Sequence, residues 1–273
     1  MDLKKLNEGL TRYIKPLSYP IAIKMLSSND EIPKLAKTAL GTFGNADMLC
    51  KSVTAARRNG WVMAVRKEDN VCTSVMECFG FYPLAPAYLE GEYQVPIHKT
   101  NKEARAKGRQ GYLKFEYGKY SAMLIAPLFR AQSIFKDGFE PDVIVLYGFP
   151  AQIYHLAEGL SYEDIQGQIA GGACAGYLIK PMLTGKCHVV LPCGGDRIVG
   201  QAQDWEIIFS MPFNKVDLVM SCLEHTYKQG HRYPIPQQIL FDSSALPPSY
   251  CQLRDAIVKY EKEYKEEEKK KKK

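Results

Sequence analysis

The cysteines of this chain carry its clearest chemical potential, because eight of them occur in 273 residues. Six fall into two blocks of similar layout, with Cys50, Cys72 and Cys78 in the first and Cys174, Cys187 and Cys193 in the second. A deprotonated cysteine is both a nucleophile and a ligand for soft metals. The N-terminus, MDLKKLNEGL, has no apolar core of signal-peptide length, so we expect a cytoplasmic protein without structural disulfides. In a reducing compartment such cysteines favour metal or redox chemistry.

The predicted metal ligands are Cys50, Cys78, Cys174 and Cys193, with Cys72 as the alternative to Cys78. If the two blocks pack about a pseudo-two-fold axis, two thiolates from each meet in one pocket. Four thiolates suffice for a [4Fe–4S] cluster or for a tetrahedral zinc ion. The spacing is unlike the C-x2-C runs of ferredoxins and zinc ribbons. Glycines before Cys174, and Gly194 and Gly195 after Cys193, would let backbone N–H groups approach the sulfur atoms, which favours the iron–sulfur cluster.

Other polar residues near these cysteines are candidates for catalysis. Arg197 either holds an anionic substrate or forms a buried pair with Asp196 that fixes the loop. Glu206 is either an acid of the site or an exposed loop residue. We expect Cys187, Cys222 and Cys251 to fill the core, as free cysteines often do.

Three function classes follow from these residues. The first is a cysteine-ligated metalloprotein that acts in electron transfer or in a reductive step of anaerobic metabolism, with a redox partner or a pathway enzyme as its partner. The second is a thiol-dependent enzyme with a cysteine nucleophile and Arg197 as its anion clamp. The third is a non-catalytic accessory protein that binds a metal, a cofactor or a partner subunit. The sequence leaves open whether the protein is an enzyme.

The elements that must position the cysteines alternate between strands and helices, which predicts an α/β (or α+β) fold. Each block follows one order: a strand, a helix with a cysteine, a glycine, a strand, and a loop with a cysteine. The predicted strands are residues 20–26 and 61–65 in the first half and residues 143–146 and 188–191 in the second. The predicted helices are residues 47–58, ended by Gly60, and residues 166–183, ended by Gly185.

This repetition predicts two related halves, each a mixed sheet flanked by helices. The halves cover about residues 15–98 and 111–215, and C-terminal helices complete a single domain over residues 1–258. Residues 259–273 contain eight Lys and five Glu, and we expect a charged, disordered tail there.

Charge and hydropathy exclude some function classes. The net charge is +6, and the tail contributes half of it, which is too little to predict nucleic-acid binding. No run of 18 or more apolar residues occurs, so the sequence predicts no transmembrane helix.

Several of these segments together resemble the DUF169 family, an uncharacterised group common in anaerobic bacteria and archaea. The resemblance spans roughly residues 15 to 215. It is carried by residues 19–24, Cys50 with residues 55–60, residues 72–78 with Gly80 and Phe81, residues 141–143, Gly148 with Pro150 and Gln152, Ala173 with Cys174, and residues 193–197. It implies that the cysteine sites are features of the family and that the setting is anaerobic. The resemblance implies no reaction.

Overall fold

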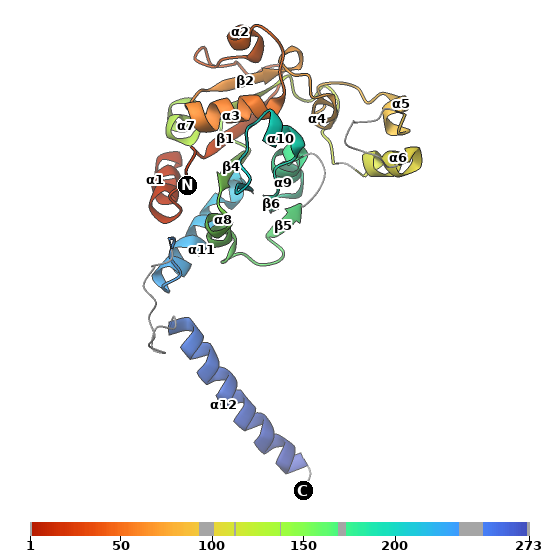
Figure 1. The fold of residues 1–273 in the computed structure, drawn as a ribbon. Coiled ribbons are helices and arrows are strands. Elements are labelled where there is room, and N and C mark those ends of the chain that lie inside the picture. The colour runs from red at the N-terminus through yellow and green to blue at the C-terminus, as the bar shows by residue number, and fades with distance from the viewer. Residues whose placement is uncertain are drawn as a thin grey trace.

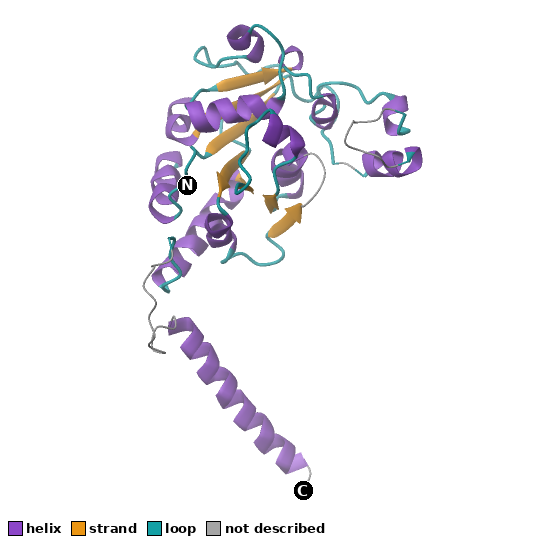
Figure 2. Cartoon of the chain, viewed as in Figure 1, coloured by secondary structure: helices purple, strands orange, loops and turns teal. Residues whose placement is uncertain are grey.

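A single seven-stranded sheet forms the centre of the computed structural model, which describes residues 2–92, 101–111, 113–136, 138–168, 173–234 and 248–271. The strands lie in the order β2-β3-β1-β4-β7-β6-β5 (Figures 1 and 2). They are β1 (Ile21–Leu26), β2 (Met63–Arg66), β3 (Ala122–Pro127), β4 (Val143–Gly148), β5 (Ile165–Gln168), β6 (Cys187–Val190) and β7 (Ile207–Pro212). Neighbouring strands are antiparallel except for β5 and β6, which are parallel. The predicted α/β class with a mixed sheet is confirmed.

Both faces of the sheet are covered because its central strands are apolar throughout, with successive side chains pointing to opposite faces. In β1, Ile21, Ile23 and Met25 enter one core, whereas Ala22 and Leu26 enter the other. We call the face of Ile21 and Ile23 the front face. It is covered by α3 (Leu49–Asn59), α4 (Thr73–Cys78), η2 (Ala175–Ile179), α9 (Lys180–Thr184) and α10 (Gly194–Ile198).

The helices of the back face are α1 (Leu3–Tyr13), α7 (Leu128–Ile134), α8 (Pro150–Ala157) and α11 (Val216–Lys228). Their apolar positions recur at helical spacing, as Leu3, Leu6 and Leu10 do in α1, and all three are buried. Smaller elements outside the two layers are α2 (Ala39–Phe43), η1 (Lys67–Asp69), α5 (Pro86–Leu89), α6 (Lys102–Gln110) and η3 (Phe213–Lys215).

Strand order repeats outward from the centre of the sheet. In the first half, β1 is followed outward by β3 and β2, and in the second half β4 is followed by β7 and β6. The registers also match, because Ile21 faces Pro127 in one half and Val143 faces Pro212 in the other. In each half the outermost of these three strands follows a front-face helix that ends at a glycine with positive φ, Gly60 or Gly185. The central pair, β1 and β4, is antiparallel, as a pseudo-two-fold axis between them requires.

The two front-face helices differ in length by one residue between the cysteine and the closing glycine. Ten positions lead from Cys50 to Gly60, whereas eleven lead from Cys174 to Gly185. The second helix contains a π-helical stretch, η2, and a π-bulge is the usual way in which a helix accommodates one extra residue. The bulge therefore lets Cys174 occupy the place in the second half that Cys50 occupies in the first.

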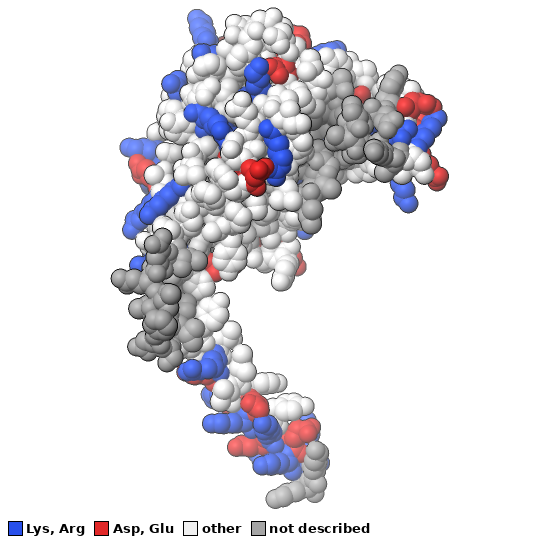
Figure 3. Space-filling model, viewed as in Figure 1, with Lys and Arg blue, Asp and Glu red and all other residues white. Residues whose placement is uncertain are grey.

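Two segments differ from the sequence predictions. Residues 166–183, predicted as helix, begin with the edge strand β5 before η2, and β5 is stabilised by its ladder to β6. Residues 259–271, expected as a disordered tail, continue the helix α12 (Pro248–Lys271), which extends away from the body (Figure 1). Ion pairs one turn apart, such as Lys265 with Glu261, support its charged half, where Figure 3 shows both signs of charge. None of the described helices is long and apolar enough to span a membrane.

Candidate functional site

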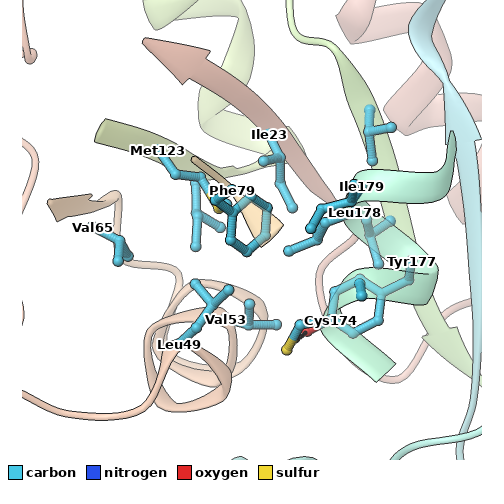
Figure 4. Close-up of a cluster of buried hydrophobic side chains, with 14 of the residues drawn as sticks. Ile23, Leu49, Val53, Val65, Phe79, Met123, Cys174, Tyr177, Leu178 and Ile179 are labelled. Atoms are coloured by element: carbon cyan, nitrogen blue, oxygen red, sulfur yellow. Dashed lines mark hydrogen bonds between the residues drawn. The ribbon is translucent and has the colours of Figure 1, made fainter. Parts of the chain in front are cut away.

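Two cysteines lie at the starts of the paired front-face helices. Cys50 is in the first turn of α3, and Cys174 directly precedes η2. Both are almost fully buried, with 3% and 5% of their surface exposed. Figure 4 shows Cys174 between Val53 of α3 and Tyr177 of η2. The thiol of Cys174 lies 3.3 Å from the Tyr177 hydroxyl.

The other two cysteines of the site each precede a short front-face helix. The carbonyl of Cys72 accepts the Met76 N–H of α4, as the carbonyl of Cys193 accepts the Arg197 N–H of α10. Both residues are half-buried. Cys72 and Cys193 are therefore counterparts in the two halves, as Cys50 and Cys174 are.

Backbone contacts bring each of these loops to the start of its partner helix. In the first half Asp47, just before α3, forms a bridge with Asn70, whose side-chain oxygen accepts the Cys72 N–H at 2.6 Å. In the second half the sulfur of Cys193 accepts hydrogen bonds from the backbone of Ala173 and of Asp196. Cys193 is thus held beside Cys174 in the fold.

The two halves meet at these cysteines. The Cys50 thiol donates to the carbonyl of Gly195, in α10, at 3.3 Å. Gly200 lies so close that a methyl group on it would come within 2.9 Å of the Cys50 Cβ. Only glycine therefore fits where the loop after α10 crosses α3.

Burial dominates the electrostatics of the site. Burial, followed by the nearby Asp196, Cys193 and Cys72, raises the pKa of the Cys50 thiol to about 12. Burial also raises the pKa of Cys174 well above its ordinary value, with Asp196, Cys50 and Cys193 again adding to the effect. The pKa of Cys193 is raised by burial and by Asp196. The four thiols are therefore electrostatic neighbours, and the three with a raised pKa are protonated at neutral pH.

Asp196 joins the cysteines to a buried polar network. One of its oxygens accepts the Cys193 thiol at 3.1 Å, and the other accepts the hydroxyls of Tyr147 at 3.3 Å and Tyr177 at 3.4 Å. Only 2% of Asp196 is exposed, and burial raises the pKa of its carboxyl. The guanidinium of Arg57 lies over the Tyr147 ring, 4.1 Å from its centroid.

Glu206, which is distant from Arg57 in the sequence, forms an ion pair with it. Its two oxygens accept from Arg57 at 2.7 and 3.1 Å, and both side chains are at least 97% buried. The sequence offered Glu206 as a site acid or an exposed loop residue, and the structure shows it as the partner of a buried arginine. Tyr147, Tyr177 and Arg57 were missed as neighbours of the site. The signal for Arg57 was its place three residues before Gly60, on the buried side of α3.

The remaining sequence candidates lie elsewhere or have other contacts. Cys78 is buried at the end of α4 in the front core, where burial raises its pKa to about 11, and Cys72 is the cysteine that interacts with it. Cys187 is buried in the back core. Arg197 pairs with the exposed Asp204 at 3.1 Å rather than with Asp196.

The glycines after Cys193 lie at the start of a helix. Gly194 and Gly195 form the first turn of α10, and it is the Gly195 carbonyl, not its N–H, that contacts a site sulfur. The glycines before Ala173 lie outside the described residues. Cys222 packs against Gly159, where a methyl group would come within 2.5 Å of the Cys222 Cβ, and Cys251 lies in α12.

No disulfide links any of the eight cysteines. Among the residues that the structure describes, no group of three or more His, Cys, Asp or Glu side chains is arranged to hold a single metal ion. The thiols of Cys50, Cys72, Cys174 and Cys193 are therefore neighbours without forming a mononuclear site.

The comparison with protein families identifies the chain. A family model described as DUF169, an uncharacterised ArCR family, matches residues 9–221. The chain belongs to the DUF169 family. The match includes both halves of the sheet and all four of the neighbouring cysteines, and it ends within α11. No curated protein and no solved structure matches the chain.

Proposed function

We propose that this DUF169 protein binds a [4Fe–4S] cluster in the seam between its two halves and acts in electron transfer or in a reductive step of anaerobic metabolism. The proposed ligands are Cys50, Cys72, Cys174 and Cys193. The observation that carries the proposal is their pairing, in which each half supplies one cysteine from a helix start and one from the loop after its outer strand. Four thiolates from a pseudo-symmetric seam match the ligand demand of a cubic cluster.

In this proposal Cys72 replaces Cys78, the ligand predicted from the sequence. Cys72 has a counterpart in Cys193 and contributes to the electrostatic environment of Cys50. The residue that follows α10 at the place of Cys78 is Val199, which cannot bind a metal. The pseudo-symmetry therefore favours Cys72.

The two candidate metal groups differ in the spacing that they require of their thiolates. A zinc ion draws its ligands to about 2.3 Å from one centre, so four zinc thiolates lie close together. In a [4Fe–4S] cluster each thiolate binds a different iron, so the sulfur atoms stand farther apart. Among the described residues, no group of three or more His, Cys, Asp or Glu side chains has the arrangement around one centre that zinc would need.

The protonation of the thiols disfavours the nucleophile hypothesis. A catalytic cysteine is activated by a pKa below its ordinary value, usually through a nearby cation. Here burial and Asp196 move the pKa of three site thiols upward, and Arg197 is engaged with Asp204. A metal displaces these protons when it binds, so raised pKa values are compatible with ligation.

The surroundings agree with a redox role in the cytoplasm. Cys72 and Cys193 are half-buried, whereas Cys50 and Cys174 are buried, so one edge of the proposed cluster would face a redox partner. Eight cysteines outside disulfides suit a reducing compartment.

Anaerobic purification and reconstitution test the proposal. We expect a brown protein with about four iron and four sulfide ions per chain. Cys193→Ser should lose both, while Cys222→Ser, at a half-buried cysteine outside the site, should keep them. A reconstituted wild type without iron would refute the cluster. Stoichiometric zinc in a colourless protein would make the site a structural metal centre instead.

A further inference from the structure

A groove on the other side of Arg57 from the cysteines is lined by side chains of two kinds. Its volume is about 960 Å³, in the range of small-molecule sites. Cations and aromatic rings line it together, and it lies between α1, the end of α3, α7 and the loop before β7. Its principal lining residues are Lys15, Tyr19, Arg57, Arg58, Phe129 and Trp205.

The backbone is strained where it places the groove cations. Among the described residues other than glycine, Lys15 and Gln201 have positive φ, at 52° and 50°. Lys15 lines the groove itself, and the carbonyl of Gln201 accepts a hydrogen bond from Arg58 at 3.0 Å. Strain of this kind persists where surrounding structure enforces it, and it clusters at binding sites.

Buried contacts enforce the conformation of Lys15. This residue follows α1 at the position where helices usually place glycine or asparagine. The fully buried Gln152, from α8, donates from its side-chain nitrogen to the carbonyls of Ile14 and Lys15, each at 2.9 Å. A lysine kept in a left-handed conformation at this place supplies a charge that glycine would not.

Aromatic rings form the walls of the groove. Tyr19 and Phe129 pair with their centroids 4.6 Å apart, and nearly half of each side chain is exposed. Trp205 stacks on Phe149 at 4.4 Å and keeps 39% of its surface exposed. Exposed aromatic side chains gathered around one groove are typical of a binding surface.

The floor of the groove is positive overall despite one carboxylate. Glu206 neutralises Arg57 through two hydrogen bonds, which leaves Lys15 and Arg58 as the excess charge. Arg58 also approaches Glu206, at 3.5 Å, and has 32% of its side chain exposed. An anion in the groove therefore meets two cations, and a flat ring beside it meets aromatic walls.

We propose that this groove binds a small aromatic anion, with its carboxylate or phosphate on Lys15 and Arg58 and its ring against Tyr19, Phe129 and Trp205. The site is separate from the cysteines and does not depend on a bound cluster. Arg57 and Tyr147 lie between the two sites.

Fluorescence titration with phenyl phosphate tests the site. The chain has two tryptophans, so the full-length Trp61→Phe variant reports on Trp205 alone. We expect saturable quenching by phenyl phosphate and by benzoate, and at least about ten-fold weaker binding of inorganic phosphate or phenol, which each lack one half of the ligand. Equal binding of phenyl phosphate and inorganic phosphate, or no saturable binding, would overturn the proposal.

Lys15→Gly distinguishes the effect of the Lys15 charge on binding from an effect on the stability of the fold. Glycine relieves the positive φ, so the melting temperature should stay the same or rise while phenyl phosphate binds about ten-fold more weakly. Arg58→Gln should weaken binding similarly, and it serves if Lys15→Gly does not fold. Lys5→Gln, in the helix α1 that precedes Lys15 but outside the groove, is the control. Unchanged affinity in both groove variants would also overturn the proposal.

Discussion

The two halves of the sheet share strand order, register and helix ends, yet they differ in how polar their cores are. Across the three strands of the first half, the neighbouring residues are Ile23, Ile125 and Met63. At the corresponding positions of the second half, they are Val145, Ser210 and His188. Conversely, the first half buries Arg57, three residues before Gly60, where the second has Met182, three residues before Gly185. Arg57 of the first half is paired with Glu206 of the second half, whereas the Ser210 hydroxyl has no hydrogen-bond partner among the described residues.

Four of the cysteines occupy corresponding positions in the two halves. Cys50 and Cys174, and Cys72 and Cys193, lie at corresponding places, whereas Cys78 and Cys187 have no counterpart. Correspondence therefore separates the proposed ligands from cysteines that only fill a core. Variants that remove or exchange one member of a corresponding pair test this comparison directly.

The largest effect is expected from Cys72→Ser compared with Cys78→Ser. Cys72→Ser should retain less than about a tenth of the wild-type iron after reconstitution, because it removes one of the four proposed thiolate ligands. Cys78→Ser should retain its iron, since that residue lies in the front core. Iron and sulfide assays on both proteins, prepared anaerobically, decide the matter. The reverse result would break the correspondence between Cys72 and Cys193.

Glu206→Leu should destabilise the protein by about 3–5 kcal/mol, because it leaves the buried Arg57 charge without its partner. Adding Arg57→Met, which copies Met182 of the second half, should recover most of that loss. Denaturant unfolding of the two variants and the wild type measures both quantities. If the double variant is no more stable than the single one, the two halves are not interchangeable at this position.

His188→Met should make the second half less sensitive to acid. Burial lowers the pKa of His188 from 6.5 to about 4. Between these two pKa values His188 is protonated in the unfolded chain but neutral in the folded chain. The free energy of unfolding therefore falls as the pH decreases from 6.5 towards 4. The expected loss at His188 is about 3 kcal/mol across that window.

Unfolding at pH 7 and near pH 4 measures this loss in the wild type. The variant, which copies Met63, should lose correspondingly less. Identical pH dependence in the two proteins would contradict the assignment.

Ser210→Ala should give the smallest effect, a gain of up to about 1 kcal/mol. The buried hydroxyl of Ser210 has no hydrogen-bond partner in the part of the chain that the structure describes, and its counterpart is the apolar Ile125. Thermal unfolding of the variant measures the gain. A clear loss of stability would indicate that the hydroxyl has an unseen partner, such as a buried water shared with His188.

Local sequence patterns predicted the centre of the fold well. The buried apolar runs of β1 and β4 and the glycine ends of α3 and α9 were predicted close to their observed positions. These features depend on residues that are near one another in the chain. The edge strand β5 was missed because its only ladder is to β6, and its residues Gln166, Gly167 and Gln168 have no strand composition of their own.

The site was less predictable because its contacts join distant residues. Glu206 and Arg57 are 149 positions apart in the sequence, and the residues around each give no sign of the pairing. The choice of Cys72 over Cys78 depended on the correspondence between Cys72 and Cys193, which lie in different halves of the chain. The correspondence between Cys50 and Cys174 is not evident from the sequence, because the π-bulge makes the number of residues to the following glycine differ between the two.

The division of the proposed ligands between two halves would also determine when a cluster can be acquired during protein synthesis. Cys72 leaves the ribosome 121 residues before Cys193. At about 5–20 residues per second, a nascent chain presents half of the site for roughly 6 to 24 seconds before the other half exists. Any cofactor held by all four thiols must therefore be delivered after the second half has emerged, or wait on two cysteines until it does.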